Sequence, residues 1–206
     1  MEIEAKFRIA ATELAELAKL RRLGAYALNP SPAPEQQENI YYDTADGRLG
    51  MARYGLRVRR VGARALVTLK GPAEVSADGV HRRAEFEFPG DQPDPNAWAP
   101  GVARDLALAL TGGAPLVPMA AVLTERYVLH VTLSGNPVAE ICLDHGLLRG
   151  GEREQPFAEV EIELLPAGSP ADLAAIATAL GAHAELVPEA QTKLQRALAL
   201  LQLVHA

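Results

Sequence analysis

Cysteine, aromatic residues and long apolar runs are all scarce in this chain. Cys142 is the single cysteine among 206 residues, so an intramolecular disulfide is excluded and a reducing, cytoplasmic location is expected. No apolar run approaches the roughly 18 residues that a membrane-spanning helix needs. The N-terminal residues Glu2, Glu4 and Lys6 are charged, so we expect neither a signal peptide nor a membrane partner.

An excess of basic residues is also missing. Lys and Arg number 20 against 26 Asp and Glu, which gives a net charge of −6. Because a general nucleic-acid binder carries a basic surface, no nucleic-acid partner is expected. A local anion site stays possible, since charge can be segregated within a fold. Hydrophobic residues at 49% and charged residues at 22% are typical of a globular protein, and we expect one domain over residues 1–206.

Hydrophobic periodicity predicts strands that each have an apolar and a charged face. The first segment, MEIEAKFRI, alternates strictly, with Glu2, Glu4 and Lys6 on one face. Further strands are predicted at 39–44, 55–61, 65–70, 81–88, 124–133, 137–144 and 157–165. Helices are predicted at about 12–23, about 102–110, 170–181 and from 188 onward, with a loop at 29–37. The Pro-, Gly- and Ala-rich segment from about 89 to 121 is expected to be a partly helical insertion.

Formal charges occupy almost every position on one face of these strands. A solvated sheet face is the common explanation for such a pattern, but it ordinarily includes Ser, Thr, Asn and Gln. Here Glu159, Glu161 and Glu163 follow one another at spacing two. Side chains at that spacing lie about 6.5–7 Å apart and repel without a counter-charge. The acids are Glu2, Glu4, Glu85, Glu87, Asp144, Glu159, Glu161 and Glu163, and the bases are Lys6, Arg57, Arg59, Lys70, Arg83 and Arg126.

A closed sheet accounts for this pattern if its charged faces point inward and its apolar faces lie outside under helices. Arg and Lys in such an interior would bind a highly charged anion. Clustered carboxylates would bind hard cations such as Mg²⁺ or Mn²⁺. Cations beside a polyphosphate suggest metal-assisted phosphoryl transfer or hydrolysis. The five histidines, His81 among them, lack metal-ligand spacing and are expected to be non-catalytic.

The N-terminal Glu2-Ile3-Glu4-Ala5-Lys6 resembles the ExExK motif of the CYTH superfamily, the triphosphate tunnel metalloenzymes. The resemblance extends over almost the whole chain through further segments in the same order. They are NIYYDT at 39–44, GLRVR at 55–59, TLK at 68–70, HRRAE at 81–85, Arg126, LDHG at 143–146, EVEIEL at 159–164 and TK at 192–193. ExExK alone is a weak indicator, whereas the ordered set is specific and is most similar to bacterial inorganic triphosphatases.

The resemblance implies an α+β fold in which an eight-stranded antiparallel β-barrel forms a tunnel, with helices packed outside. It also implies site residues, with Mg²⁺ or Mn²⁺ as the cofactor. The metal ligands are expected to be Glu2, Glu4, Glu159, Glu161 and Asp144. The triphosphate is expected to contact Lys6, Arg57, Arg59, Lys70, Arg83, Arg126 and Lys193. Catalysis is expected to depend on Glu2, Glu4, Lys6 and Glu85.

The implied activity is metal-dependent hydrolysis of inorganic triphosphate to pyrophosphate and phosphate. Three alternative activities need the same triphosphate-binding residues: thiamine triphosphatase, nucleoside triphosphatase and class IV adenylate cyclase. The aromatic content of 5% offers no clear set for binding a base, which mildly favours a substrate without one. A non-catalytic polyphosphate-binding module is a lower alternative, because it would keep the bases and lose the acids. Many bacterial relatives continue into a CHAD domain, whereas this chain ends at Ala206.

Overall fold

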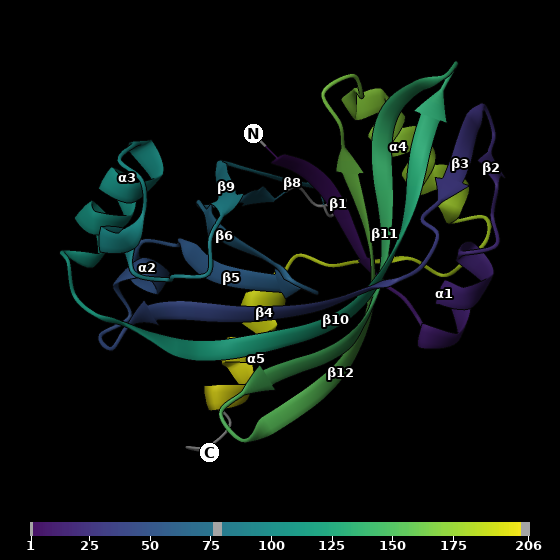
Figure 1. The fold of residues 1–206 in the computed structure, drawn as a ribbon. Coiled ribbons are helices and arrows are strands. Elements are labelled where there is room, and N and C mark those ends of the chain that lie inside the picture. Colours follow the sequence, from purple (N-terminus) through teal and green to yellow (C-terminus); the bar gives the residue numbers. More distant parts are fainter. Residues whose placement is uncertain (1, 76–79, 203–206) are drawn as a thin grey trace.

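The computed structural model describes residues 2–75 and 80–202 of the chain (Figure 1). Its strands are β1 (Glu2–Arg8), β2 (Arg22–Leu23), β3 (Tyr26–Pro30), β4 (Glu35–Thr44), β5 (Gly55–Val61), β6 (Arg64–Lys70), β7 (Glu74–Val75), β8 (Val80–Arg83), β9 (Glu85–Pro89), β10 (Leu116–Leu133), β11 (Asn136–Gly150), β12 (Arg153–Leu164) and β13 (Val187–Pro188). Its helices are α1 (Ala11–Leu17), α2 (Arg48–Met51), α3 (Val102–Thr111), α4 (Pro170–Leu180) and α5 (Lys193–Gln202), with a 3₁₀ turn at Pro95–Ala97. Among these described helices, none is long and apolar enough to cross a membrane.

The strands of the described residues form one antiparallel sheet that curls into a nearly closed barrel (Figure 1). The main path through the sheet runs β7–β8–β1–β12–β11–β10–β4–β5–β6–β9. β8 and β9 lie near opposite ends of this path, yet they follow each other in the chain and are separated only by Ala84. β8 pairs with β1 and β9 pairs with β6, so the segment 80–89 brings the two edges together. With this segment counted once, eight long strands surround the interior, and the predicted antiparallel barrel is confirmed.

Helices cover the outer, apolar faces of the barrel in two places. α1 and α4 pack on β1 and β10–β12 around buried residues such as Leu17, Ile141 and Ile176. α2 and α3 pack over β5 and β6, where the rings of Phe88 and Trp98 meet edge to face with centroids 5.1 Å apart. The apolar positions of the predicted strands therefore face outward under helices, as the alternation predicts.

The last helix, α5, packs on the inner face of the sheet. Ala120 and Val122 of β10 pack with Ala197 of α5, and they lie on the same strand face as Arg126. Gly150 of β11 faces α5 so closely that an added Cβ would lie 2.3 Å from the Ala197 carbonyl oxygen. The expectation that helices pack outside the barrel does not hold for this helix. The expectation was wrong because the strands predicted at 124–133 and 137–144 were too short to include their apolar inner positions.

Local turn geometry accounts for two further differences at the N-terminal end. The helix predicted at 12–23 ends at Leu17, because Arg22–Leu23 pairs with Tyr26–Pro30 in a hairpin. Gly24 in that hairpin has φ +56°, a left-handed conformation that glycine adopts without strain. The loop predicted at 29–37 is mostly strand, because β3 and β4 both pair with β10.

Pairing with β1 also accounts for differences between the predicted and observed elements where the two edges of the sheet meet. The strand predicted at 81–88 is divided at Ala84, where the chain changes partner from β1 to β6. The last helix begins at Lys193 rather than at 188, because Val187–Pro188 pairs with the end of β1 as β13. Helix α3 lies in the predicted insertion, whose part from Leu116 onward belongs to β10.

Candidate active site

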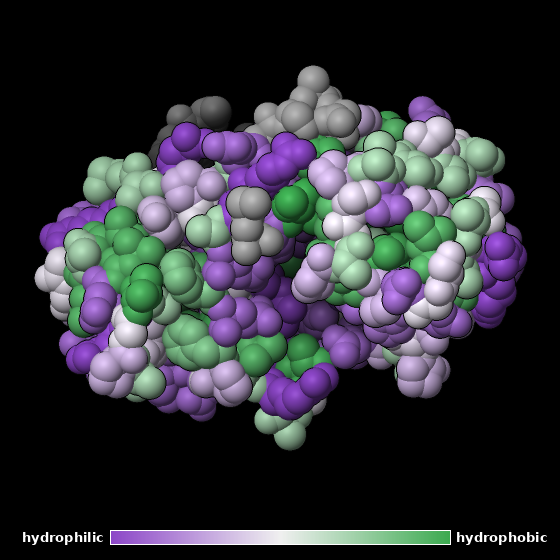
Figure 2. Space-filling view, turned by 90° about the horizontal axis from the view of Figure 1, so that it is seen from above, coloured by the Kyte–Doolittle hydropathy of each residue, from purple (hydrophilic) through white to green (hydrophobic). Residues whose placement is uncertain are grey.

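The charged strand faces enclose a tunnel inside the barrel, as their alternation predicts. Two adjoining cavities of about 280 and 330 Å³ share Arg59, Lys70 and Arg126 among their lining residues. In Figure 2 the surface is hollowed near the middle of the view, and hydrophilic side chains lie in this hollow. Four strands contribute Glu2, Glu4, Glu159, Arg57 and Lys70, and each of these side chains is at most one-fifth exposed. The sheet therefore gathers acids and bases that are far apart along the chain.

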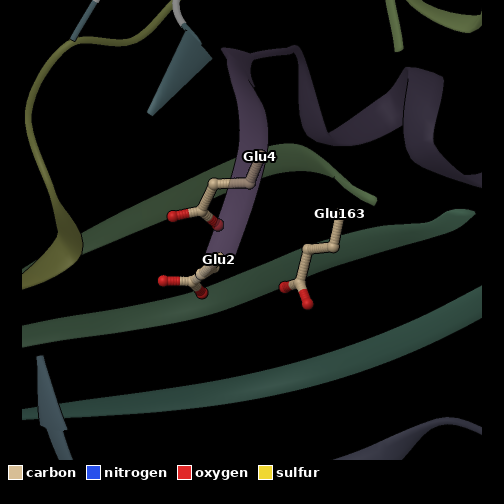
Figure 3. A group of neighbouring side chains, drawn as sticks. All are labelled: Glu2, Glu4 and Glu163. Atoms are coloured by element: carbon tan, nitrogen blue, oxygen red, sulfur yellow. The ribbon is translucent and has the colours of Figure 1, made fainter. Parts of the chain in front are cut away.

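Strands β1 and β12 bring three carboxylates together (Figure 3). Glu2 and Glu4 share the inner face of β1, and Glu163 of β12 lies opposite Glu4 in the strand register. One oxygen from each of the three carboxylates lies within 4.8 Å of the other two. Arg83 donates hydrogen bonds of 2.6 Å to both Glu2 and Glu4, and Lys70 donates one of 2.8 Å to Glu2. We call Glu2, Glu4 and Glu163 the acidic cluster.

The environment shifts the pKa values of two of these carboxylates in opposite directions. Burial raises the pKa of Glu2, but Lys70 and Arg83 outweigh it and hold the pKa below its ordinary value. Burial raises the pKa of Glu163 to about 7, although Arg126 opposes the shift. A divalent cation beside Glu163 would favour its ionised form, because an opposite charge stabilises a carboxylate.

A second acidic group surrounds the first residue of α5. Lys193 contacts Asp144 at 2.9 Å and both Glu159 and Glu161 at 2.8 Å. Burial lowers the pKa of Lys193, but these three carboxylates raise it well above its ordinary value. Arg126 adds a bidentate pair with Asp144 at 2.8 and 2.7 Å and a contact with Glu161 at 2.5 Å. In this structure the three carboxylates are therefore neutralised by lysine and arginine.

Lys6 links the two acidic groups. Its Nζ lies 3.0 Å from Glu4 and 3.7 Å from Glu161, and the side chain is almost completely buried. Glu85 extends the chain of ion pairs on the opposite side, at 3.3 Å from Lys70 and 3.9 Å from Arg57. Ion pairs among the described residues connect twelve of the thirteen predicted site residues into one network. Arg59 is the predicted site residue outside this network.

Arg59 is a partly buried cation without an ion pair in the described part of the chain. Its Nε donates a hydrogen bond of 3.2 Å to the amide oxygen of Asn39. Burial and the neighbouring cations Arg57 and Arg126 lower its pKa to about 10. A guanidinium remains charged at neutral pH even then, so three like charges converge here on both cavities. Such a site favours an anion.

Among the inner residues without a predicted role are Glu163, Tyr41 and Cys142. Glu163 was grouped with the charged face, and only the β1–β12 register places it opposite Glu4. Tyr41 lies opposite Arg57 on β4 and lines the first cavity. Cys142 lies on the inner face of β11 and is buried, and burial raises the pKa of its thiol well above its ordinary value. Pairing β4 with β5 in sequence would have found Tyr41, whereas the other two need the three-dimensional register.

Comparison with known proteins relates this tunnel to a family. The model of the CYTH domain matches residues 1–198. The inorganic triphosphatase of Haemophilus influenzae is 30% identical over 128 residues, which cover 61% of this chain and 35% of that protein. The chain therefore aligns with about one-third of that relative.

Solved structures share the same fold at low sequence identity. A protein from Hippeastrum, described as a candidate adenylyl cyclase with a dominant triphosphatase activity, has a TM-score of 0.70 at 20% identity and covers 100% of this chain and 97% of its own. A candidate adenylate cyclase from Bacillus halodurans has a TM-score of 0.64 at 20% identity and covers 95% and 96%. The PH1819 protein of Pyrococcus horikoshii has a TM-score of 0.60 at 20% identity and covers 97% and 99%. With the family model matched over 1–198 and the tunnel built as described, this chain belongs to the CYTH family.

Proposed function

We propose that the tunnel binds inorganic triphosphate and hydrolyses it to pyrophosphate and phosphate with the help of Mg²⁺ or Mn²⁺. The observation that supports this most strongly is Arg59, a partly buried guanidinium beside Arg57 and Arg126 that forms no ion pair with a carboxylate of the described residues. A polyphosphate would supply the missing negative charge, and a guanidinium can bind it through two parallel hydrogen bonds. Lys70, which lines both cavities, adds a further cation.

The acidic cluster fits a hard divalent cation. Carboxylate oxygens are the ligands that Mg²⁺ and Mn²⁺ prefer, and Glu2, Glu4 and Glu163 each bring one oxygen within 4.8 Å of the others. When bound, the cation supplies positive charge for phosphate oxygens and lowers the pKa of water. Asp144, Glu159 and Glu161, which were also predicted as ligands, would need to exchange Lys193 for a cation before they could bind one.

The chain's own residues would then share the work of hydrolysis. Arg57, Arg59 and Arg126 would hold the phosphates and stabilise the charge that develops on the bridging oxygen as it leaves. Glu85 would keep Lys70 and Arg57 directed into the cavity through its contacts with both. A carboxylate of the tunnel wall would take one proton from the attacking water.

The proposed activity is tested by measuring phosphate release from inorganic triphosphate by the purified protein. We expect release with Mg²⁺ or Mn²⁺, and none with EDTA in place of metal. Pyrophosphate serves as the control substrate, because it lacks the third phosphate. Equal release with and without EDTA would contradict the metal dependence, and no release with either metal would contradict the activity.

A substrate with an organic group is a second candidate, supported by one observation. The first cavity is lined by Tyr41 and Tyr54, together with Leu194 and Leu198 of α5. Apolar and aromatic side chains beside a phosphate site would accommodate a base or a thiamine ring. A panel of inorganic triphosphate, ATP and thiamine triphosphate separates the candidates, and the highest kcat/KM identifies the substrate class.

A further inference from the structure

Two of the arginines in the tunnel are held by carboxylates. Arg83 donates from Nε to Glu2 at 2.6 Å, and Arg126 donates from Nε to Asp144 at 2.8 Å. A second nitrogen of each guanidinium also donates to a carboxylate, since the Nη2 of Arg83 lies 2.6 Å from Glu4 and that of Arg126 lies 2.7 Å from Asp144. The charge of these two side chains is therefore offset within the protein.

The two arginines of β5 are held instead by neutral oxygens. Arg57 donates from Nε to the Thr68 hydroxyl at 3.3 Å, and Arg59 donates from Nε to the amide oxygen of Asn39 at 3.2 Å. A neutral acceptor fixes the position of an arginine without cancelling its charge. Arg57 still has carboxylates at 3.8 and 3.9 Å, which is beyond hydrogen-bond distance, whereas Arg59 has no ion pair among the described residues.

The strand register determines how the Asn39 amide is oriented. Asn39 of β4 lies opposite Arg59 on β5 and opposite Val122 on β10, and it is almost completely buried. Its Nδ2 donates to the Val122 carbonyl oxygen at 3.3 Å, and its Oδ1 accepts from Arg59. A carbonyl oxygen can only accept and a guanidinium can only donate, so both partners select the same amide orientation. An ionised aspartate could accept from Arg59 but could not donate to Val122, and it would cancel the charge of the arginine.

The other two nitrogens of Arg59 are accessible to the contents of the tunnel. Nη1 and Nη2 have no partner among the described residues, and neither belongs to the buried side-chain atoms of those residues that lack one. Arg59 is only partly buried, and it lines both cavities. Because Nε is occupied by Asn39, the edge formed by Nη1 and Nη2 is the one left to bind two oxygens of an anion in parallel.

We propose that Asn39 is a positioning residue for the substrate, an inference that rests on the proposed triphosphatase function. Its amide oxygen holds Arg59 by Nε, so that Nη1 and Nη2 face a phosphoryl group of triphosphate end-on and the full charge of the guanidinium is kept for the substrate. Asn39 itself is almost completely buried, so it acts on the substrate through Arg59. Because the anchored side chain loses less conformational freedom when the anion binds, its affinity for the anion is higher.

A double-mutant cycle tests whether Asn39 acts through Arg59. Asn39→Leu keeps the approximate size of the side chain and removes the acceptor without adding a charge. We expect N39L to lower kcat/KM for inorganic triphosphate about fivefold or more in the wild-type background, and less than about twofold when Arg59→Met is already present. A purely structural role, through the lost bond to Val122, would lower kcat/KM by the same factor in both backgrounds and would overturn the proposal. Asn29→Leu, at an exposed position on β3, is the matched control and should leave kcat/KM unchanged.

¹⁵N NMR of the Arg59 guanidinium, assigned by the signals that R59M loses, adds a readout that needs no variant of Asn39. When the wild-type protein is titrated with inorganic triphosphate in EDTA, we expect the Nη signals to shift and the Nε signal to keep its position. A shift confined to Nε would overturn the proposal, because the anion would then have replaced Asn39. If the wild-type protein neither binds nor hydrolyses triphosphate, the proposed function fails. If it hydrolyses triphosphate while the Nη signals stay unchanged, the role of Asn39 alone fails.

Discussion

At the scale of single residues, the tunnel contains a cation, Arg59, that forms no ion pair among the described residues. Arg59 is held by the amide of Asn39 and lies among other cations. Its neighbour Arg60 faces the other way, is 43% exposed in its side chain and pairs with Glu38 at 3.7 Å. Like-charge repulsion from Arg57 and Arg126 disfavours the charged form of Arg59, and the proposed polyphosphate would offset this repulsion.

Arg59→Met should weaken triphosphate binding without weakening the fold. A hydrogen bond to a charged group is worth about 1.5–3 kcal/mol, so we expect KM to rise by roughly 10- to 100-fold. The melting temperature of the empty protein should stay the same or rise, because repulsion with Arg57 and Arg126 is relieved. Steady-state kinetics and thermal denaturation measure the two effects. Arg60→Met is the control, and an equal rise in KM for both variants would contradict the assignment.

Glu4→Gln should remove metal-dependent turnover and leave the fold intact. The substitution keeps one oxygen near Arg83 and Lys6 but removes the negative charge that would hold a cation. Because the cation supplies several kcal/mol of transition-state stabilisation, we expect kcat/KM to fall by about 100-fold or more. Full activity of E4Q would show that the first-strand acids do not bind the metal. Glu38→Gln, an exposed carboxylate paired with Arg60, is the matched control for the assay.

At the scale of elements, strand length decides what the sequence could predict. The alternation in residues 2–8 and 55–61 predicts β1 and β5 closely, because charged and apolar residues alternate along all of β1 and along the central part of β5. β10 and β11 change character along their length, and their inner faces turn from charged to apolar at Val122 and Leu148. A period-two pattern cannot say which face is inner once both faces are apolar, so the position of α5 was not predictable.

Gly150→Ala should displace α5 from the tunnel. The added Cβ would lie 2.3 Å from the Ala197 carbonyl oxygen and 3.0 Å from Leu200, and backbone cannot move aside as a flexible side chain can. Overpacking of this kind costs about 1–3 kcal/mol, so we expect a lower melting temperature. Gly181→Ala is the control, because its Cβ would meet only contacts of 3.4 Å or more and its φ is −61°. Equal melting temperatures for G150A and the wild type would contradict the packing described here.

At the scale of the whole molecule, the buried ion pairs make stability depend on pH. Burial raises the pKa of Glu2, Asp144 and Glu161, but neighbouring cations lower each of them below its ordinary value. Below about pH 4.5 the unfolded chain therefore binds more protons at these three carboxylates than the folded one, and stability falls as pH drops. The raised pKa values of Glu159 and Glu163 act in the opposite direction, at pH values above that range. We expect the melting temperature to fall steadily below about pH 4.5, where the unfolded carboxylates begin to protonate. A melting temperature that does not change between about pH 5 and 3 would contradict the lowered pKa values of these carboxylates.

The sequence predicts the contents of the tunnel better than its closure. The acids and bases predicted on the strands lie on the inner face of the sheet. Alternate residues of a strand share one face, and the apolar face has to be covered by helices, so the charged face is the inner one. The sequence does not give the partners of each strand. Three features depend on contacts between segments that are distant in the sequence. They are the change of partner strand at Ala84, the register that places Glu163 opposite Glu4, and the pairing of β13 with β1.

The continuous chain of ion pairs has a consequence for ligand exchange. Glu2 and Glu4 form ion pairs with Arg83 and Lys70. An anion that took these bases would free the acids, and a cation that took the acids would free the bases. Each ligand arriving alone leaves an uncompensated charge in a low-dielectric interior, whereas the two arriving together leave none. Under the proposed function, binding would be a double replacement, in which metal and polyanion each raise the other's affinity by thermodynamic linkage.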